Sequence, residues 1–426
     1  MIRDFNFKLK NVGLINNADI NLSKINVIAG DNSTGKSTSS KILYSFLRSN
    51  SKTRKELAKT TLIDEILDLA SEINSFYRFS EFENKNRFQK KSELSEIINE
   101  IRINQLKGKD IDIVNHYIKI KNIFREYTFK YAGTNLFDKS ISDIDKLIEI
   151  YEEDGEDLFN SIMNLIIRSE FGKTVLKDNE VQFSGKFDNI PFTYQGHLMN
   201  SGMKTDGRLV IDDVFYLESL SLFDLFSRGG SQNTEHVEHI FKCINLDVSN
   251  AWADEIKNKK IINIEEMLFE ITGGSFVYDE GNVIFNDDFL MKNTSSGIKQ
   301  IGLIQMLLNT RQLKENSFLI IDEPEVNLHP KWQIKFAEIL TLLANDLNIT
   351  VYINTHSPLF IEAMRTFSEQ QNLLGETNFY LTYESEENEG KYDIKYVPTE
   401  DLNTIYNSLG KPYETLSEIS IENQFK

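Results

Sequence analysis

The sequence predicts an α/β fold with a mixed sheet core and a large all-helical insertion. Apolar runs typical of strands alternate with helical segments in residues 1–50 and again in residues 181–426. Between them, residues 51–180 repeat apolar side chains at helical spacing and contain no proline. Strands have a period of about two residues and helices a period of about 3.6. We therefore expect the two end segments to build one α/β core that brackets the insertion.

The N-terminal part of the expected core consists of strands followed by a helix. FNFKLKNVG alternates apolar and polar residues, LINNADINL follows it, and INVIAG is a short apolar run that ends at Gly30. The helix is expected from Lys36 to about Ser49, where apolar residues recur on one face.

The C-terminal part contains a second, smaller helical insertion at about residues 234–270. Strand patterns fill residues 181–218 before it, and GSFVYDEGNVIF after it is typical of a hairpin. A helix follows NTSSG, and the apolar strands SFLIID and TVYINTHS flank a helix at about residues 331–346. A closing helical segment is expected near the C-terminus.

The composition is that of a globular protein without a membrane partner. Of the 426 residues, 40% are hydrophobic and 26% are charged. No apolar run approaches the ~20 residues of a membrane helix, and the first residues lack the apolar core of a signal peptide. Cys243 is the only cysteine, which excludes an internal disulfide. We therefore expect a cytoplasmic protein.

The net charge of −18 makes the chain a poor non-specific coat for DNA, because phosphate contacts rest on Lys and Arg. Residues 51–140 hold many Lys and Arg, with nearly as many acids. A solvated helical surface is the favoured interpretation of this segment. A local contact with DNA stays open as an alternative.

GDNSTGKS fits the phosphate-binding pattern G-x-x-x-x-G-K-[ST] between an expected strand and an expected helix. Its glycines let backbone N–H groups surround the phosphates, Lys36 reaches the β- and γ-phosphates, and the Ser37 hydroxyl ligates Mg²⁺. The sequence therefore predicts a nucleotide site with Mg²⁺. The predicted binding residues of this loop are Gly30, Asp31, Asn32, Ser33, Thr34, Gly35, Lys36, Ser37 and Thr38.

Two other apolar strands end in residues that can carry chemistry. SFLIID ends at Asp322 and is followed by Glu323, and ligands of open α/β sheets bind at such strand ends. We expect Asp322 to hold Mg²⁺ through water and Glu323 to act as general base toward the attacking water. TVYINTHS carries His356 directly after its apolar strand, as a candidate sensor of the γ-phosphate. The predicted catalytic residues are therefore Glu323, His356 and Lys36.

NTSSGIKQ is a second candidate anion site, far along the chain from the first. It places Ser295, Ser296 and Gly297 at the start of an expected helix. Free backbone N–H groups and the helix dipole favour an anion at such a position.

The order of these motifs resembles that of ABC-type ATPases. The phosphate loop comes first, then a Ser-Ser-Gly signature, then Asp-Glu-Pro with Asn-Leu-His-Pro, and finally Thr-His-Ser-Pro. The motifs DEPEVNLHP and THSP are similar to those of the OLD (overcoming lysogenisation defect) branch of these ATPases. The resemblance covers about residues 1–49 and 205–365. It implies a P-loop ABC-type ATPase head that hydrolyses ATP with Mg²⁺.

The resemblance also implies a head-to-tail homodimer, or a larger homo-oligomer, in which each ATP touches the P-loop of one subunit and the signature of the other. Ser296 and Gly297 match the signature core, and Asn327 to His329 match the loop that crosses between subunits. Ile298 and Lys299 depart from the Leu-Ser-Gly-Gly-Gln of transporters, which argues against a transporter motor. Lys299 is expected to bring a positive charge to the γ-phosphate bound by the other subunit.

In this family a glutamine from a lid loop usually completes the Mg²⁺ shell, and two residues compete for that role. Gln195 fits by residue type. Glu218 lies at the end of the strand VFYLES, a better-placed position. The sequence does not decide between them.

OLD proteins often carry a C-terminal Toprim nuclease, which needs a Glu and an Asp-x-Asp to hold metal. The segment after His356 is short for another domain and contains no Asp-x-Asp. We therefore expect no nuclease activity in this chain. It resembles instead the stand-alone ATPase subunits of anti-phage defence systems, with Septu as the first choice and PARIS or retron-linked cassettes next. There the ATPase scaffolds and controls a separate effector, an HNH or Toprim nuclease.

Two other functions stay open. The first is a RecF- or SMC-like repair or recombination ATPase that clamps DNA, which a basic groove shared by both subunits would favour. The second is a structural scaffold that binds ATP without turning it over. The expected general base Glu323 argues against the second.

Overall fold

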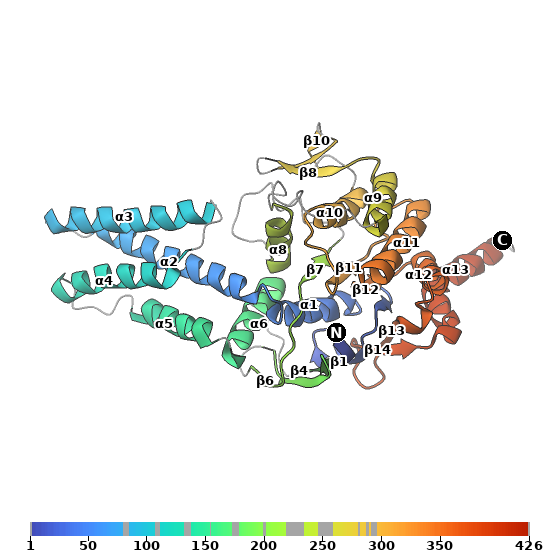
Figure 1. The fold of residues 1–426 in the computed structure, drawn as a ribbon. Helices are drawn as coiled ribbons and strands as arrows, with labels where there is room; N and C mark the ends of the chain where they lie inside the picture. Colours follow the sequence, from blue (N-terminus) through green and yellow to red (C-terminus); the bar gives the residue numbers. More distant parts are fainter. Residues whose placement is uncertain are drawn as a thin grey trace. The chain divides into compact units, whose positions relative to one another are not determined.

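The computed structural model forms two compact units, whose helices and strands are drawn in Figure 1. The first unit joins Met1–Lys52 to Met163–Lys426, and the second is Thr53–Ile162. The structure describes residues 2–79, 85–106, 111–131, 138–153, 155–172, 179–198, 202–218, 234–245, 259–279, 282–286, 289–290 and 296–424.

A mixed sheet forms the centre of the first unit. Its described strands lie in the order β6-β5-β4-β1-β2-β14-β13-β3-β12-β11-β7. Their bounds are β1 (Ile2–Val12), β2 (Ile15–Asn21), β3 (Ile25–Ala29), β4 (Glu180–Phe187), β5 (Ile190–Gly196), β6 (Met203–Asp206), β7 (Val214–Leu217), β11 (Phe318–Asp322), β12 (Thr350–Thr355), β13 (Thr377–Glu384) and β14 (Tyr392–Val397).

The direction of the strands divides this sheet. β7, β11, β12, β3 and β13 are joined by parallel pairs, and β1, β2, β4, β5 and β6 are joined by antiparallel pairs. Between the two groups, β14 pairs antiparallel with β13 and parallel with β2. β3 and β7 are buried along their whole length, as expected for parallel strands covered on both faces. The predicted α/β fold with a mixed sheet is confirmed.

Helices of the first unit pack on the sheet and enclose its core. Their bounds are α1 (Lys36–Ser49), α8 (Glu235–Ile244), α9 (Lys259–Thr272), α10 (Ser296–Asn309), α11 (Pro330–Leu347), α12 (Pro358–Gln370) and α13 (Asn403–Gln424), with the 3₁₀ turns η3 (Leu374–Glu376) and η4 (Thr399–Asp401). Aliphatic residues of β3, β11 and β12 pack with those of α10 and α11 in one apolar cluster. Burial of this apolar surface is the main force that holds the unit together.

A small second sheet lies beside α10 (Figure 1). It has the order β10-β9-β8, with β8 (Phe276–Asp279), β9 (Asn282–Phe285) and β10 (Phe289–Leu290). The backbone N–H of Phe276 donates to Gln305 Oε1 on α10 at 3.2 Å. β8 and β9 are the two strands of the hairpin expected from GSFVYDEGNVIF.

The described elements of the second unit are all helices, which confirms the expected kind of insertion. It holds α2 (Arg54–Phe79), α3 (Lys85–Leu106), α4 (Ile113–Tyr131) and α5 (Asp138–Glu153). Leu and Ile side chains at helical spacing form its core. Tyr117 and Lys121 on α4 both bond Asp145 on α5, at 3.0 and 2.5 Å.

The compact helical unit ends at Ile162, earlier than the boundary near residue 180 that the sequence suggested. The reason lies in α6 (Glu156–Phe171), whose second half contacts α8 of the first unit. The N–H of Glu235 donates to Ser169 Oγ at 2.7 Å, and His236 Nδ1 lies 2.8 Å from Glu170. In the described part of the chain, no helix has both the length and the apolar composition to cross a membrane.

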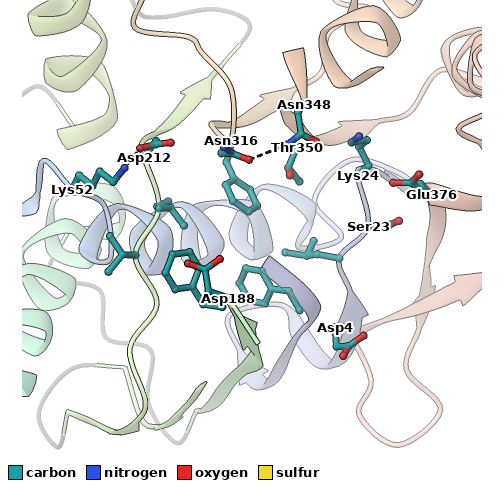
Figure 2. A pocket seen from close by; sticks show the side chains of 16 residues that line it. Asp4, Ser23, Lys24, Lys52, Asp188, Asp212, Asn316, Asn348, Thr350 and Glu376 are labelled. Atoms are coloured by element: carbon teal, nitrogen blue, oxygen red, sulfur yellow. Dashed lines mark hydrogen bonds and ion pairs between the residues drawn. The ribbon is translucent and has the colours of Figure 1, made fainter. Parts of the chain in front are cut away.

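A cavity of about 700 Å³ lies at the amino ends of the parallel strands (Figure 2). Lys24, Phe318 and Thr350, at or just before the starts of β3, β11 and β12, line it. Figure 2 shows the bond at its rim that Asn348 donates to Asn316 at 2.9 Å. Ligands of parallel sheets bind at the carboxyl ends, so the motifs of the sequence lie at the opposite edge from this cavity.

Candidate functional site

The phosphate loop occupies the turn between β3 and α1, and two glycines shape it. Gly30 has a φ of +152°, and a Cβ there would lie 1.9 Å from Thr382 Oγ1. Gly35 has a φ of +93°, and a Cβ there would lie 2.7 Å from Ile15 Cγ1. Both the backbone conformation and the lack of space therefore require glycine.

The Lys36 ammonium lies inside this loop. Its Nζ donates to the carbonyl oxygens of Gly30 at 2.8 Å and Asp31 at 2.5 Å. Burial lowers the pKa of Lys36, and the nearby carboxylates of Asp322 and Glu323 act in the opposite direction. The loop's own carbonyl oxygens thus hold the amine inside the loop.

The other loop residues differ in exposure. Asp31, Asn32, Ser33 and Ser37 are exposed, Thr38 is half-buried, and Thr34 is buried with its hydroxyl bonded to the Asp31 carbonyl at 2.8 Å. Ser37 lies in the first turn of α1. Its hydroxyl is available to an incoming group at the rim of the loop.

Asp322, the last residue of β11, is held by residues from two other elements. Its Oδ1 accepts from Asn354 Nδ2 on β12 at 2.9 Å, and its Oδ2 accepts from Tyr216 on β7 at 3.2 Å. Asn354 Nδ2 also donates to Ser40 Oγ on α1 at 2.8 Å. Neither Asn354 nor Tyr216 was predicted from the sequence, because only the pairing of distant strands brings them to Asp322.

Glu323 follows with a φ of +53°, in the left-handed region that few non-glycine residues adopt. Its N–H donates to the Asn354 carbonyl at 2.9 Å, which fixes this conformation. Burial raises the pKa of Glu323, the nearby Asp322 and Glu325 carboxylates raise it further, and His356 acts in the opposite direction. A carboxylate with a raised pKa is a stronger base once ionised.

Glu325 is a third acid of the same segment, and no role was predicted for it from the sequence. Its side chain is 4% exposed. One oxygen, Oε1, accepts from Thr355 Oγ1 at 2.7 Å and from the His356 N–H at 2.8 Å. The His356 ring lies beside it, with Nδ1 3.2 Å from Glu325 Oε1 and 3.6 Å from Glu323 Oε1. The second Glu in the sequence DEPE is the only local feature that could have marked Glu325 as a candidate site residue.

The start of α10 lies next to the acids in the same chain. Gln300 Nε2 donates to the carbonyls of Leu217 and Asp322, both at 3.3 Å. A Cβ at Gly297 would lie 2.2 Å from the Asn327 carbonyl, so glycine is needed for this close approach. Lys299 is half-buried. Ser295 lies outside the described residues, and Ser296 is the first residue of α10.

The two candidates for the lid position lie on different strands. Gln195 is an exposed residue of β5, where it pairs with Gln182 and Lys204. Glu218 follows β7, the strand beside β11, and its Oε1 lies 2.5 Å from Lys41 Nζ on α1. Glu218 is therefore the candidate close to the P-loop helix.

Asp213, His239 and Cys243 are the described residues whose ligand atoms lie close enough to share a metal ion, within 4.8 Å of one another. Asp213 Oδ1 lies 3.0 Å from His239 Nε2 and 3.5 Å from Arg48 Nη1. Burial and Arg48 lower the pKa of His239, but Asp213 and Cys243 offset both and raise it to about 9. Two cations thus already neutralise this carboxylate, and we interpret the group as a buried ion cluster that joins α1 to α8.

Comparison with known proteins identifies the segment that contains these motifs. Residues 5–361 match the family described as AAA ATPase domain. A comparison with curated proteins found no match.

Solved structures similar to this chain include heads of SMC proteins. The SMC head domain from Thermotoga maritima has 12% identity and a TM-score of 0.39, over 93% of this chain and 99% of that one. The SMC head bound to the C-terminal winged-helix domain of ScpA has 10% identity and a TM-score of 0.42, over 94% and 99%. The SMC head with an extended coiled coil, bound to the C-terminal domain of ScpA from Pyrococcus furiosus, has 10% identity and a TM-score of 0.30, over 98% and 99%.

Proposed function

The chain belongs to the AAA ATPase domain family, and from that membership we propose that it is an ABC-type ATPase of the OLD branch that hydrolyses ATP with Mg²⁺. One observation carries the proposal. The Lys36 charge in the loop after β3 interacts with the carboxylates of Asp322 and Glu323 at the end of β11. β3, β12 and β11 are parallel neighbours, so the loop and both acids open on one edge of the sheet.

The residues of this edge fit ATP and Mg²⁺. The glycine positions leave the loop backbone free of side chains, and Lys36 supplies a cation within it. The residues Gly30 to Thr38 would bind the phosphates. Ser37 and Asp322 supply the hydroxyl and carboxylate oxygens that Mg²⁺ prefers, and they would hold the ion. Mg²⁺ in such sites neutralises the charge that develops on the phosphate oxygens.

The chain's own residues then have separate tasks. Glu323 takes the proton of the attacking water while the new bond to the γ-phosphorus forms and the bond to the β–γ bridging oxygen breaks. Lys36 holds the β- and γ-phosphate oxygens. His356, whose ring is 41% exposed beside Glu323, contacts the γ-phosphate.

We also propose that a second copy completes the site head to tail. Ser295, Ser296, Gly297 and Lys299 at the start of α10 would face the γ-phosphate held by the other copy. The position of these residues at the start of α10 supports this role, because the first-turn N–H groups of a helix lack intrahelical partners and the helix dipole favours an anion there. The oligomer is a homodimer or a larger homo-oligomer.

The biological role proposed here rests on the resemblance to defence ATPases. The chain would act in the cytoplasm as the ATPase subunit of an anti-phage system, with Septu as the first choice. Its ATP state would scaffold and control a separate HNH or Toprim nuclease, and the chain itself would cut nothing.

Phosphate release tests the proposed ATP hydrolysis, and capture of a partner tests the proposed control of a nuclease. Wild type and Lys36→Ala are compared for phosphate release from Mg·ATP, and each is purified beside the product of the adjacent gene. We expect hydrolysis by wild type, none by the variant, and capture of a nuclease by wild type. Absence of hydrolysis contradicts the ATPase proposal. Hydrolysis without capture, together with retention of duplex DNA, would favour a DNA-clamping ATPase instead.

A further inference from the structure

We propose that Glu325 is the positioning residue for His356, and that its negative charge rather than its shape performs this task. The inference deepens the proposed ATPase function and rests on it. Glu325 bonds the end of β12 at both its hydroxyl and its backbone, through Thr355 Oγ1 and the His356 N–H. It thereby fixes the segment from which the His356 ring projects.

The burial of Glu325 calls for an explanation that shape alone does not provide. Its side chain is 4% exposed, and among the described residues its second oxygen, Oε2, has no hydrogen-bond partner. A buried charge with an unpaired oxygen is costly, whereas an uncharged glutamine could accept the same two bonds at Oε1. The charge therefore has a role beyond anchoring the strand.

The position of the His356 ring indicates that role. Nδ1 lies 3.2 Å from Glu325 Oε1 and 3.6 Å from Glu323 Oε1, and it makes no aligned hydrogen bond with any described residue. A small rotation of the ring selects one of the two carboxylates. Two flanking carboxylates favour the tautomer with its proton on Nδ1.

The competition between the two acids has a consequence for the reaction. When the Nδ1 proton faces Glu325, the Glu323 carboxylate stays free to orient water, and Nε2 is left for the γ-phosphate. When Glu325 loses its charge, the Nδ1 proton turns to Glu323 and occupies the base. Glu325 acts through His356 and Glu323 and does not itself touch the substrate.

A pair of substitutions separates charge from shape. Glu325→Gln keeps the shape and removes the charge, whereas Glu325→Asp keeps the charge and shortens the side chain. Glu362→Gln, at a partly exposed position of α12 away from His356, is the control for kcat and for the His356 signals. For each protein we would measure kcat, the Kd for Mg·ATP and the melting temperature. The ¹⁵N shifts of His356 would be recorded without nucleotide and assigned with His356→Gln.

We expect Glu325→Gln to lower kcat by about 10- to 100-fold with a less than about threefold change in Kd, since misplaced groups slow chemistry more than binding. Its His356 ¹⁵N signals should shift, because the Nδ1 proton turns from Glu325 to Glu323, while Glu325→Asp should keep the wild-type signals and more of the rate. Glu362→Gln should keep the wild-type kcat, Kd and His356 signals. Wild-type kcat and ring shifts in Glu325→Gln, or a larger loss in the Asp variant, would overturn the proposal. If wild type hydrolyses no ATP, the proposed function fails, and the ring shifts still decide the position of His356.

Discussion

The carboxylate of Asp322 and the side-chain amide of Asn354 are joined by a 2.9 Å hydrogen bond between the neighbouring strands β11 and β12. The same amide nitrogen donates to Ser40 Oγ on α1 at 2.8 Å. One side chain therefore links the acid proposed to hold Mg²⁺ with the helix that follows the phosphate loop. A substitution at Asn354 should therefore affect the positions of both Asp322 and α1.

Replacement of Asn354 by Ala should loosen Asp322 and raise the Mg²⁺ concentration that gives half-maximal ATP hydrolysis. Loss of two buried hydrogen bonds should also lower the free energy of unfolding by about 1–3 kcal/mol. Hydrolysis rates across a Mg²⁺ titration and denaturant melts measure the two effects. Asn345→Ala, at an exposed position of α11, is the control. An unchanged Mg²⁺ titration would show that Asn354 does not position Asp322 for Mg²⁺ binding.

Replacement of Gly30 by Ala should abolish nucleotide binding, because the new Cβ would lie 1.9 Å from Thr382 Oγ1. The loop must then move away from β13, and its N–H groups lose their common direction. Gly410→Ala is the matched control, because no atom of the described residues lies within 4 Å of a Cβ at that position of α13. Alanine should stabilise that helix by up to about 1 kcal/mol. Titration with a fluorescent ATP analogue compares the two, and equal affinities would contradict the loop geometry.

The buried ion cluster at α8 predicts a loss of stability on the alkaline side of neutrality. Asp213 and Cys243 offset burial and raise the pKa of His239 to about 9. A raised pKa gives stability that is complete below the unfolded value of about 6.5 and is lost as pH rises through about 9. The loss should be on the order of 1–3 kcal/mol between these values.

Melting temperatures of wild type and His239→Gln from pH 6 to 9.5 measure this effect. Wild type should lose stability across the interval, and the variant should be less stable at pH 6 with a flatter profile. Parallel profiles would show that His239 is not the titrating group. Loss on the acid side is a separate effect, because Glu235 and Asp213 have lowered pKa values and lose their contribution as pH falls.

The parts of the candidate site that could be predicted from the sequence are those formed by residues close together in the chain. The loop from Gly30 to Ser37 could be predicted from a single run of residues. Gly30 and Gly35 both have a positive φ, a local backbone conformation that favours glycine. The α/β fold followed from the same kind of signal, as in the apolar strands that end at Asp322 and Thr355.

The supporting residues could not be predicted in this way. Asn354 meets Asp322 only because β12 pairs with β11 in that register, and Tyr216 joins them from β7 on the other side. Glu325 could have been marked as a repeated acid, but its bonds to Thr355 and His356 require the fold. Gln195 shows the converse, because its residue type suited the lid while its strand is a different one from that beside β11.

We propose that ATP joins two copies of this chain and that Glu323 ends that state by hydrolysis. Light-scattering mass of Glu323→Gln with and without Mg·ATP tests it most directly, with wild type and Glu362→Gln measured in parallel. We predict that ATP converts the variant into a stable multimer of the chain that outlasts the wild-type one, because the amide cannot take the proton of the attacking water. A mass for Glu323→Gln that ATP leaves unchanged, at ATP concentrations that saturate the site, would contradict the account.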